Sequence, residues 1–241
     1  MRSSRWLLEC RGLGALPCPP ATSPNVTEFV CSSPSLSDFP SGFPKETRSI
    51  SVEFTNISII SVDAFRALPH LRELHLSNNR LKTLPNSLWR NHPALTALDL
   101  TNNLLKDLPL GLFGLARLQG LNLEGNGMRS VAEDAFRTVP ELRFLFLQNN
   151  SLEALPRKVF APLESLEVLD LSHNRLSALE PPFSKHVAES GLDLAGNPWV
   201  CDCRSGCDIA RRVRIWLMLN PGSKLQVDRP LSKRSPSSPK I

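Results

Sequence analysis

LRELHLSNNRL, residues 71–81, decides the architecture of this chain, because the same pattern of leucines and one asparagine returns along it. Close copies of the pattern are LTALDLTNNLL (95–105), LRFLFLQNNSL (142–152) and LEVLDLSHNRL (166–176). Its asparagine recurs at steps of 23 or 24 residues, as Asn79, Asn103, Asn126, Asn150, Asn174 and Asn197. A period of this length indicates small structural units that bury their apolar faces only by stacking on one another.

Each unit has the alternation of a short strand. Leu74 and Leu76 are two residues apart and share one face, whereas His75 points to the other. The same inward pair recurs as Leu98/Leu100, Leu121/Leu123, Leu145/Leu147, Leu169/Leu171 and Leu192/Leu194. A second apolar column, predicted for the opposite wall, consists of Phe65, Trp89, Phe113, Phe136, Phe160 and Phe183. The asparagines are polar in an apolar setting, so we expect them to bind backbone groups of the turns.

These features define an α/β-type leucine-rich repeat solenoid. It should have a curved parallel sheet on its concave face, an irregular or short helical convex face, and about seven repeats between two caps. The predicted regions are a leader or non-native start (1–17), a cysteine-containing N-terminal cap (18–48), the repeats (49–197), an atypical C-terminal cap (198–220) and a basic disordered tail (221–241).

The net charge of +5 is distributed unevenly. From Arg204 onward the chain has nine Lys/Arg and two Asp/Glu, so residues 1–203 carry a net charge of about −2. A nucleic-acid-binding protein needs a basic patch on its folded part, and none is visible here. No apolar run approaches the roughly 20 residues of a membrane span. Glu9 and Arg11 interrupt the N-terminal leucines, so the start of the chain is a poor secretory signal.

The cysteines favour an oxidising compartment because all six lie outside the repeats. They are Cys10, Cys18 and Cys31 before the array, and Cys201, Cys203 and Cys207 after it. This placement predicts disulfide-bonded caps of an extracellular protein, with a Cys18–Cys31 bond covering Ile50 and Val52 of the first repeat. Free thiols in a cytosolic repeat protein are the alternative, and a zinc site at CDCRSGC lacks a fourth ligand. Export also agrees with predicted glycosylation at Asn25, Asn56 and Asn149, which begin Asn-x-Ser/Thr motifs.

Three stretches of sequence, two of them overlapping, carry a resemblance to a known family. NPWVCDC (197–203) resembles the start of the C-terminal cap of extracellular leucine-rich repeat proteins, and SVEFTNIS (51–58) with GLDLAGNPWVCD (191–202) resembles the leucine-rich alpha-2-glycoprotein family. The similarity covers roughly residues 18–203. It implies a secreted, non-enzymatic glycoprotein with cytochrome c or a component of transforming-growth-factor-β (TGF-β) signalling as its partner. The chain departs from the family in having no cysteine after Cys207, which leaves the pairing in the C-terminal cap open.

No motif of a known catalytic site, cofactor or metal centre occurs in the sequence. Ser51, His75 and Asp99 fall on adjacent outward positions and superficially resemble a catalytic triad, but ordinary polar residues on a solvated sheet are the favoured interpretation. We therefore expect no enzyme activity, cofactor or metal.

The outward strand positions predict a binding face. Of 21 such positions, six are carboxylates and none is Lys or Arg, although Arg72 and Arg143 lie one position outside the set. Phe144 and Phe146 are the large apolar side chains on this face and are predicted to anchor a basic protein ligand. The predicted polar partners are Asp99, Asn122, Glu124, Asp170 and Asp193. The alternatives are that Asp is common at this position in repeat proteins, and that a cap, a loop or a second copy covers the rings.

Two functions of different class follow. The first is a secreted binding protein that holds a protein ligand on its concave face, with TGF-β-type signalling as the process that the resemblance implies. The second is a matrix or adhesion component whose basic tail binds glycosaminoglycans. An intracellular scaffold is a third, since the signal sequence is poor.

Overall fold

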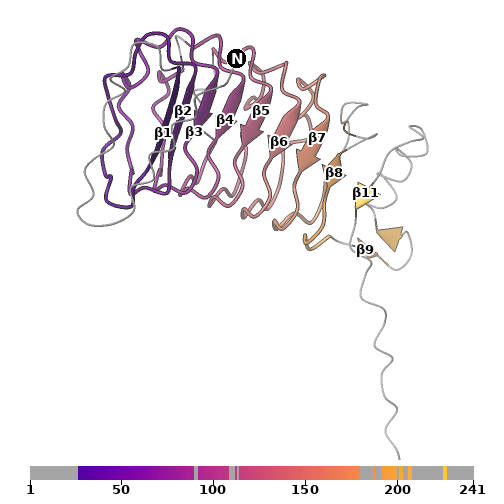
Figure 1. Cartoon of the computed structure of the whole chain (residues 1–241). Helices are drawn as coiled ribbons and strands as arrows, with labels where there is room; N and C mark the ends of the chain where they lie inside the picture. The colour runs from indigo at the N-terminus through magenta and orange to yellow at the C-terminus, as the bar shows by residue number, and fades with distance from the viewer. Residues whose placement is uncertain are drawn as a thin grey trace, which may run out of the picture.

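The chain folds into a solenoid whose coils stack side by side, with the strands along one wall (Figure 1). The computed structural model describes residues 27–89, 92–108, 112, 114–179, 187 and 191–199, together with three short strands beyond them. Its strands are β1 (Glu28–Ser32), β2 (Ser49–Glu53), β3 (Glu73–His75), β4 (Ala97–Asp99), β5 (Gly120–Asn122), β6 (Phe144–Phe146), β7 (Val168–Asp170), β8 (Leu192–Asp193), β9 (Cys201–Asp202), β10 (Gly206–Cys207) and β11 (Leu225–Gln226). Nine of them form one sheet in the order β1-β2-β3-β4-β5-β6-β7-β8-β11, and β9 pairs with β10.

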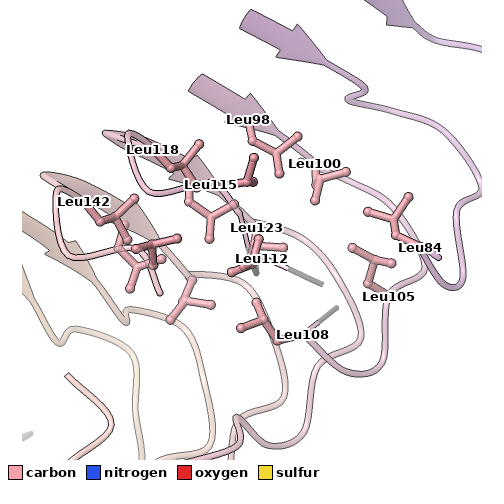
Figure 2. Close-up of a cluster of buried hydrophobic side chains, with 14 of the residues drawn as sticks. Leu84, Leu98, Leu100, Leu105, Leu108, Leu112, Leu115, Leu118, Leu123 and Leu142 are labelled. Atoms are coloured by element: carbon pink, nitrogen blue, oxygen red, sulfur yellow. The ribbon is translucent and has the colours of Figure 1, made fainter. Parts of the chain in front are cut away.

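Strands β2 to β8 are the seven strands that the repeat pattern predicts, and their pairing is parallel throughout. The central leucines lie opposite one another, as Leu98, Leu121 and Leu145 do, and all are buried. Leucines from the strands and from the opposite wall meet inside the coils (Figure 2). The predicted fold class is therefore confirmed.

The convex wall consists mainly of turns in the part of the chain that the structure describes. Phe65, Trp89 and Phe136 have no exposed surface, and Phe160 is also buried, as the second apolar column predicts. Phe65 stacks on Trp89 with ring centroids 6.4 Å apart, and Phe136 stacks on Phe160 at 5.9 Å. Phe113 and Phe183 lie outside the described residues.

The asparagine column forms a ladder that joins successive coils. In each step the amide Nδ2 donates to a carbonyl of its own repeat and to one of the preceding repeat, while Oδ1 accepts a backbone N–H of the preceding repeat. Asn126 is one example: Nδ2 donates to Leu123 O and Leu100 O, both at 3.0 Å, and Oδ1 accepts from Leu105 N at 3.1 Å. Thr55 ends the ladder, because its N–H and hydroxyl both donate to Asn79 Oδ1. The expected binding of the asparagines to the turns is confirmed.

The edge of the first repeat is covered by a strand that the sequence reading missed. β1 pairs in parallel with β2 and places Phe29 beside Ile50 and Cys31 beside Val52, so both aliphatic side chains are fully buried. Alternation in EFVCS, with Phe29 and Cys31 inward, was the available signal. Cys31 is disulfide-bonded in the structure. Cys10 and Cys18 lie outside the described residues, so the pairing with Cys18 stays a prediction.

Beyond β8 the sheet is extended by β11, which pairs Leu225 with Leu192. This strand falls inside the segment 221–241, for which disorder stays a prediction. In the adjoining hairpin the backbone of Cys207 lies opposite that of Cys201, while Cys203 lies outside the described residues.

Candidate ligand-binding face

The strand register brings most of the predicted site residues into one row on the concave face. Asp99, Asn122, Phe146, Asp170 and Asp193 are neighbours on consecutive strands, β4 to β8. Adjacent strands lie about 4.8 Å apart, so the row from Asn122 to Asp170 spans about 10 Å. All five side chains are half-buried.

The two predicted aromatic anchors are accessible from the concave side. Phe144 and Phe146 flank the buried Leu145 of β6 and are both half-buried. The rings are therefore outside the leucine core, and no described loop or cap covers them fully. This geometry keeps them available to a ligand.

The acids of this row also have a structural task that the sequence reading did not assign. Asp99 Oδ1 accepts hydrogen bonds from the N–H of Thr101 (2.9 Å) and from its hydroxyl (2.6 Å). The same side-chain cap of the residue two positions later is formed by Asn122, Asp170 and Asp193, at 2.9–3.0 Å. Asp and Asn commonly cap a turn in this way. One oxygen of each is thus committed to the fold, which explains why these residue types recur here.

Glu124 is the outward residue that follows Asn122, two residues further along the chain, and residues of the next repeat bind its side chain. Its carboxylate accepts from Gln148 Nε2 and Asn149 Nδ2, both at 2.9 Å. Both donors are neutral amides, and together they fix the orientation of the Glu124 side chain. The predicted acidic rim beside Phe146 is therefore ordered.

Arg143 also belongs to the candidate site, although it lies just before β6 and so outside the outward positions that strand alternation selects. Its guanidinium lies 5.3 Å from the centroid of the Phe144 ring and pairs with the Glu167 carboxylate at 2.8 Å. The ion pair holds the guanidinium in place, and the cation–π contact joins it to the Phe144 ring. The signal in the sequence was the position of Arg143 immediately before the strand, with Glu167 one repeat later.

The superficial triad does not assemble. Asp99 Oδ1 is bound to Thr101, and the charged neighbour of His75 is Glu73, with Nε2 and Oε2 3.9 Å apart. Among the described residues no hydrogen bond joins Ser51, His75 and Asp99, and no group of His, Cys, Asp or Glu is arranged to hold a metal ion. The described stretches also contain no helix with the length and hydropathy of a membrane crossing.

The predicted glycosylation acceptors lie away from the leucine core. Asn56 and Asn149 are exposed, and Asn56 Nδ2 donates to Pro34 O at 2.6 Å. Asn149 borders the binding face through its bond to Glu124, and Asn25 lies outside the described residues. Occupancy of these sites stays a prediction.

Comparison with known proteins agrees with the architecture. The leucine rich repeat family model matches residues 45–105, 93–152 and 140–198. The chain belongs to the leucine-rich repeat family.

Within that family the chain is similar to a phospholipase A2 inhibitor of Gloydius brevicaudus siniticus. The two are 48% identical over 260 aligned residues, which cover 78% of each chain. Phospholipase A2 inhibitor beta of Elaphe climacophora is 64% identical over 75 residues, or 31% of this chain and 23% of the relative. A solved octameric complex of Latrophilin 3, Unc5D and FLRT2, whose FLRT2 component is a leucine-rich repeat domain, matches with a TM-score of 0.61. That match has 25% identity over 80% of this chain and 72% of the other. These comparisons support the leucine-rich repeat family and give no support to the finer resemblance to leucine-rich alpha-2-glycoprotein.

Proposed function

We propose that this chain is a secreted, non-enzymatic protein that binds a protein ligand on its concave face, with a phospholipase A2 as the ligand class. The observation that carries the proposal is the pair of half-buried rings, Phe144 and Phe146, on the concave face, where the neighbours of Phe146 on both adjacent strands are polar. Aromatic side chains in such a setting are typical anchors of protein interfaces. The ligand class comes from the relatives that are named as phospholipase A2 inhibitors.

Charge favours a basic ligand. The described concave strands carry carboxylates at Asp99, Asp170 and Asp193 but no Lys or Arg at the outward positions, and Arg143 is paired with Glu167. An acidic rim steers a basic partner and speeds its association. Among phospholipases A2, the basic ones should therefore bind more tightly than the acidic ones.

Secretion is supported by separate features. Cys31 is disulfide-bonded, which fits an oxidising compartment, and two glycosylation motifs are exposed.

The test is binding of a basic secreted phospholipase A2 to the wild-type chain and to Phe146→Ala, measured by calorimetry together with inhibition of phospholipid hydrolysis. Loss of an interface anchor should weaken binding by tenfold or more, which corresponds to about 1.4 kcal/mol. Phe54→Ala is the matched control, because Phe54 is an exposed ring that follows β2, four strands away. Equal affinity of Phe146→Ala and wild type would refute the proposed site.

Other ligands and one other function are tested alongside. Cytochrome c and components of TGF-β-type signalling are the partners that the family resemblance implies. Binding of each to wild type, Phe146→Ala and Phe54→Ala shows whether either of them uses the same face. A matrix component that binds glycosaminoglycans through residues 221–241 is the alternative function. Heparin affinity that disappears when this segment is removed, without phospholipase binding, would favour it.

A further inference from the structure

The row of outward residues next to the aromatic pair contains a step in side-chain size. On β3 to β7 this row reads Glu73, Ala97, Gly120, Phe144 and Val168, each opposite the next. A methyl group added at Gly120 would meet nothing within 4 Å, so the space above this residue is open. On β5 the residue without a side chain therefore lies between Phe144 on β6 and the small Ala97 on β4.

Acidic and polar groups border this open space. In the adjoining row, Asp99 is the outward residue that follows Ala97 on β4, and Asn122 is the outward residue that follows Gly120 on β5. Asp99 Oδ1 caps Thr101, but its second oxygen accepts no hydrogen bond from the described residues. The step thus combines an aromatic residue on one side, small residues at Gly120 and Ala97, and, in the adjoining row, a carboxylate oxygen that accepts no hydrogen bond from the described residues.

We propose that the step above Gly120 receives a lysine or arginine side chain of the protein ligand. Its aliphatic stem would lie over Gly120 and Ala97 against Phe144, and its charge would reach Asp99 Oδ2. Long basic side chains bury their stems on apolar surface in this way while the head group stays with polar partners. The inference rests on the proposed function and names the part of the ligand that the face reads.

Arg143 shows the same chemistry within the chain itself. Its guanidinium lies over the Phe144 ring while bonding to the Glu167 carboxylate on the β7 side. Phe144 thus already contacts one cation from its own chain. The β5 side of the residue, above Gly120, is where a cation from the ligand would lie.

Two substitutions test the inference without disturbing the fold. Gly120→Leu fills the step, and its backbone is not in the left-handed region, so the larger side chain is tolerated. Asp99→Asn removes the charge but keeps the turn cap, as Asn122 caps Glu124 on the next strand. The controls are Ser49→Leu, in the same row on β2, and Asp134→Asn, the same charge change at an exposed residue in the turns of the convex wall.

The probe is the basic secreted phospholipase A2 used above, unmodified, with acetylated lysines, and with modified arginines. Gly120→Leu should weaken binding at least tenfold and Asp99→Asn about three- to tenfold, whereas both controls stay within about twofold. One of the two modifications of the enzyme should weaken its binding to the wild-type chain. The same modification should have little further effect on binding to Gly120→Leu, because the modification and the substitution remove the same contact. Circular dichroism melting of each variant checks that the solenoid is intact.

The two proposals fail in different ways. If Phe146→Ala weakens binding but Gly120→Leu binds as tightly as wild type, the step is not the recognition element and only the further inference is overturned. The same holds if modification of the enzyme weakens wild type and Gly120→Leu by equal factors. If neither Phe146→Ala nor Gly120→Leu changes binding, or the wild-type chain does not bind, the proposed function fails and the inference falls with it.

Discussion

Removing Asn150 should destabilise the solenoid through one identifiable backbone group. Asn150 Nδ2 donates to Leu123 O at 2.9 Å and to Leu147 O at 3.1 Å, and Oδ1 accepts from Met128 N at 3.1 Å. The side chain is 8% exposed, so water does not readily replace it. Asn150→Ala deletes all of these bonds at once.

The backbone groups that bind Asn150 differ in whether they keep another hydrogen bond after the substitution. Leu123 O also accepts from Asn126, and Leu147 O also accepts from Asn174, so both carbonyls remain satisfied. Met128 N–H loses its side-chain acceptor and is left buried without a partner. An unsatisfied buried backbone group costs about 1–3 kcal/mol, whereas loss of a second bond to a carbonyl costs less. We therefore expect the free energy of unfolding to fall by about 2 kcal/mol, within a range of about 1–3 kcal/mol.

Urea unfolding followed by circular dichroism measures this change. Ser151→Ala is the control in the adjacent residue, whose hydroxyl makes no hydrogen bond among the described residues, and it should change the free energy of unfolding by no more than about 0.5 kcal/mol. Asn150→Asp should be worse than Asn150→Ala at neutral pH, because a carboxylate oxygen would face two carbonyls. A free energy for Asn150→Ala that matches the control would refute the ladder as a source of stability.

Two further predictions concern the buried histidine and the N-terminal cap. Burial lowers the pKa of His92, and the hydrogen bond to Leu68 O opposes this with a smaller raising effect. The contribution of neutral His92 to the free energy of unfolding is therefore fully present above the unfolded pKa of about 6.5, and it is lost as the pH falls from there through the lower folded pKa. His92→Asn, which keeps a donor for Leu68 O, should flatten this loss in unfolding curves between pH 7 and 5, and an unchanged slope would contradict the assignment. Peptide mapping without reduction should link Cys31 to Cys18, and Cys31→Ser should lower the free energy of unfolding by about 2–5 kcal/mol; a link from Cys31 to another cysteine would disprove the pairing.

The architecture was predictable because repetition turns weak local signals into a strong one. A single LxxLxL segment is ambiguous, but six asparagines at steps of 23 or 24 residues fix the strands, the core leucines and the ladder together. The cap strand β1 is unique in the chain, so no repeat supports it. Its alternation of Phe29 and Cys31 spans five residues only, and its pairing with β2 depends on tertiary contact.

The face on which these residues lie was predictable from the sequence, but the hydrogen bonds that they make were not. Alternation placed Phe144, Phe146 and Asp99 on the concave face correctly, since the side-chain period of a strand fixes the face. The number of outward carboxylates, however, does not reveal how many of their oxygens are free to bind a ligand. The caps at Thr101 and Ser172 show that part of each Asp serves its own turn. Contacts between repeats, such as Arg143 with Glu167, depend on register and escape a reading of one repeat at a time.

Departures from the repeat therefore identify function better than the residues that obey it, and Phe146 allows a direct test. On β4, β5, β7 and β8 its position holds Asp or Asn, which caps the turn, whereas a phenyl ring has no acceptor. If Phe146 is retained for ligand binding at the expense of that cap, Phe146→Asn should be more stable than Phe146→Ala by about 0.5–1.5 kcal/mol, the usual contribution of one hydrogen bond. Both variants should still bind the basic phospholipase A2 equally weakly, because both lack the ring. Equal stability of the two variants in urea unfolding would show that the cap contributes nothing here. Recovery of binding by Phe146→Asn would show that the aromatic ring is not the anchor.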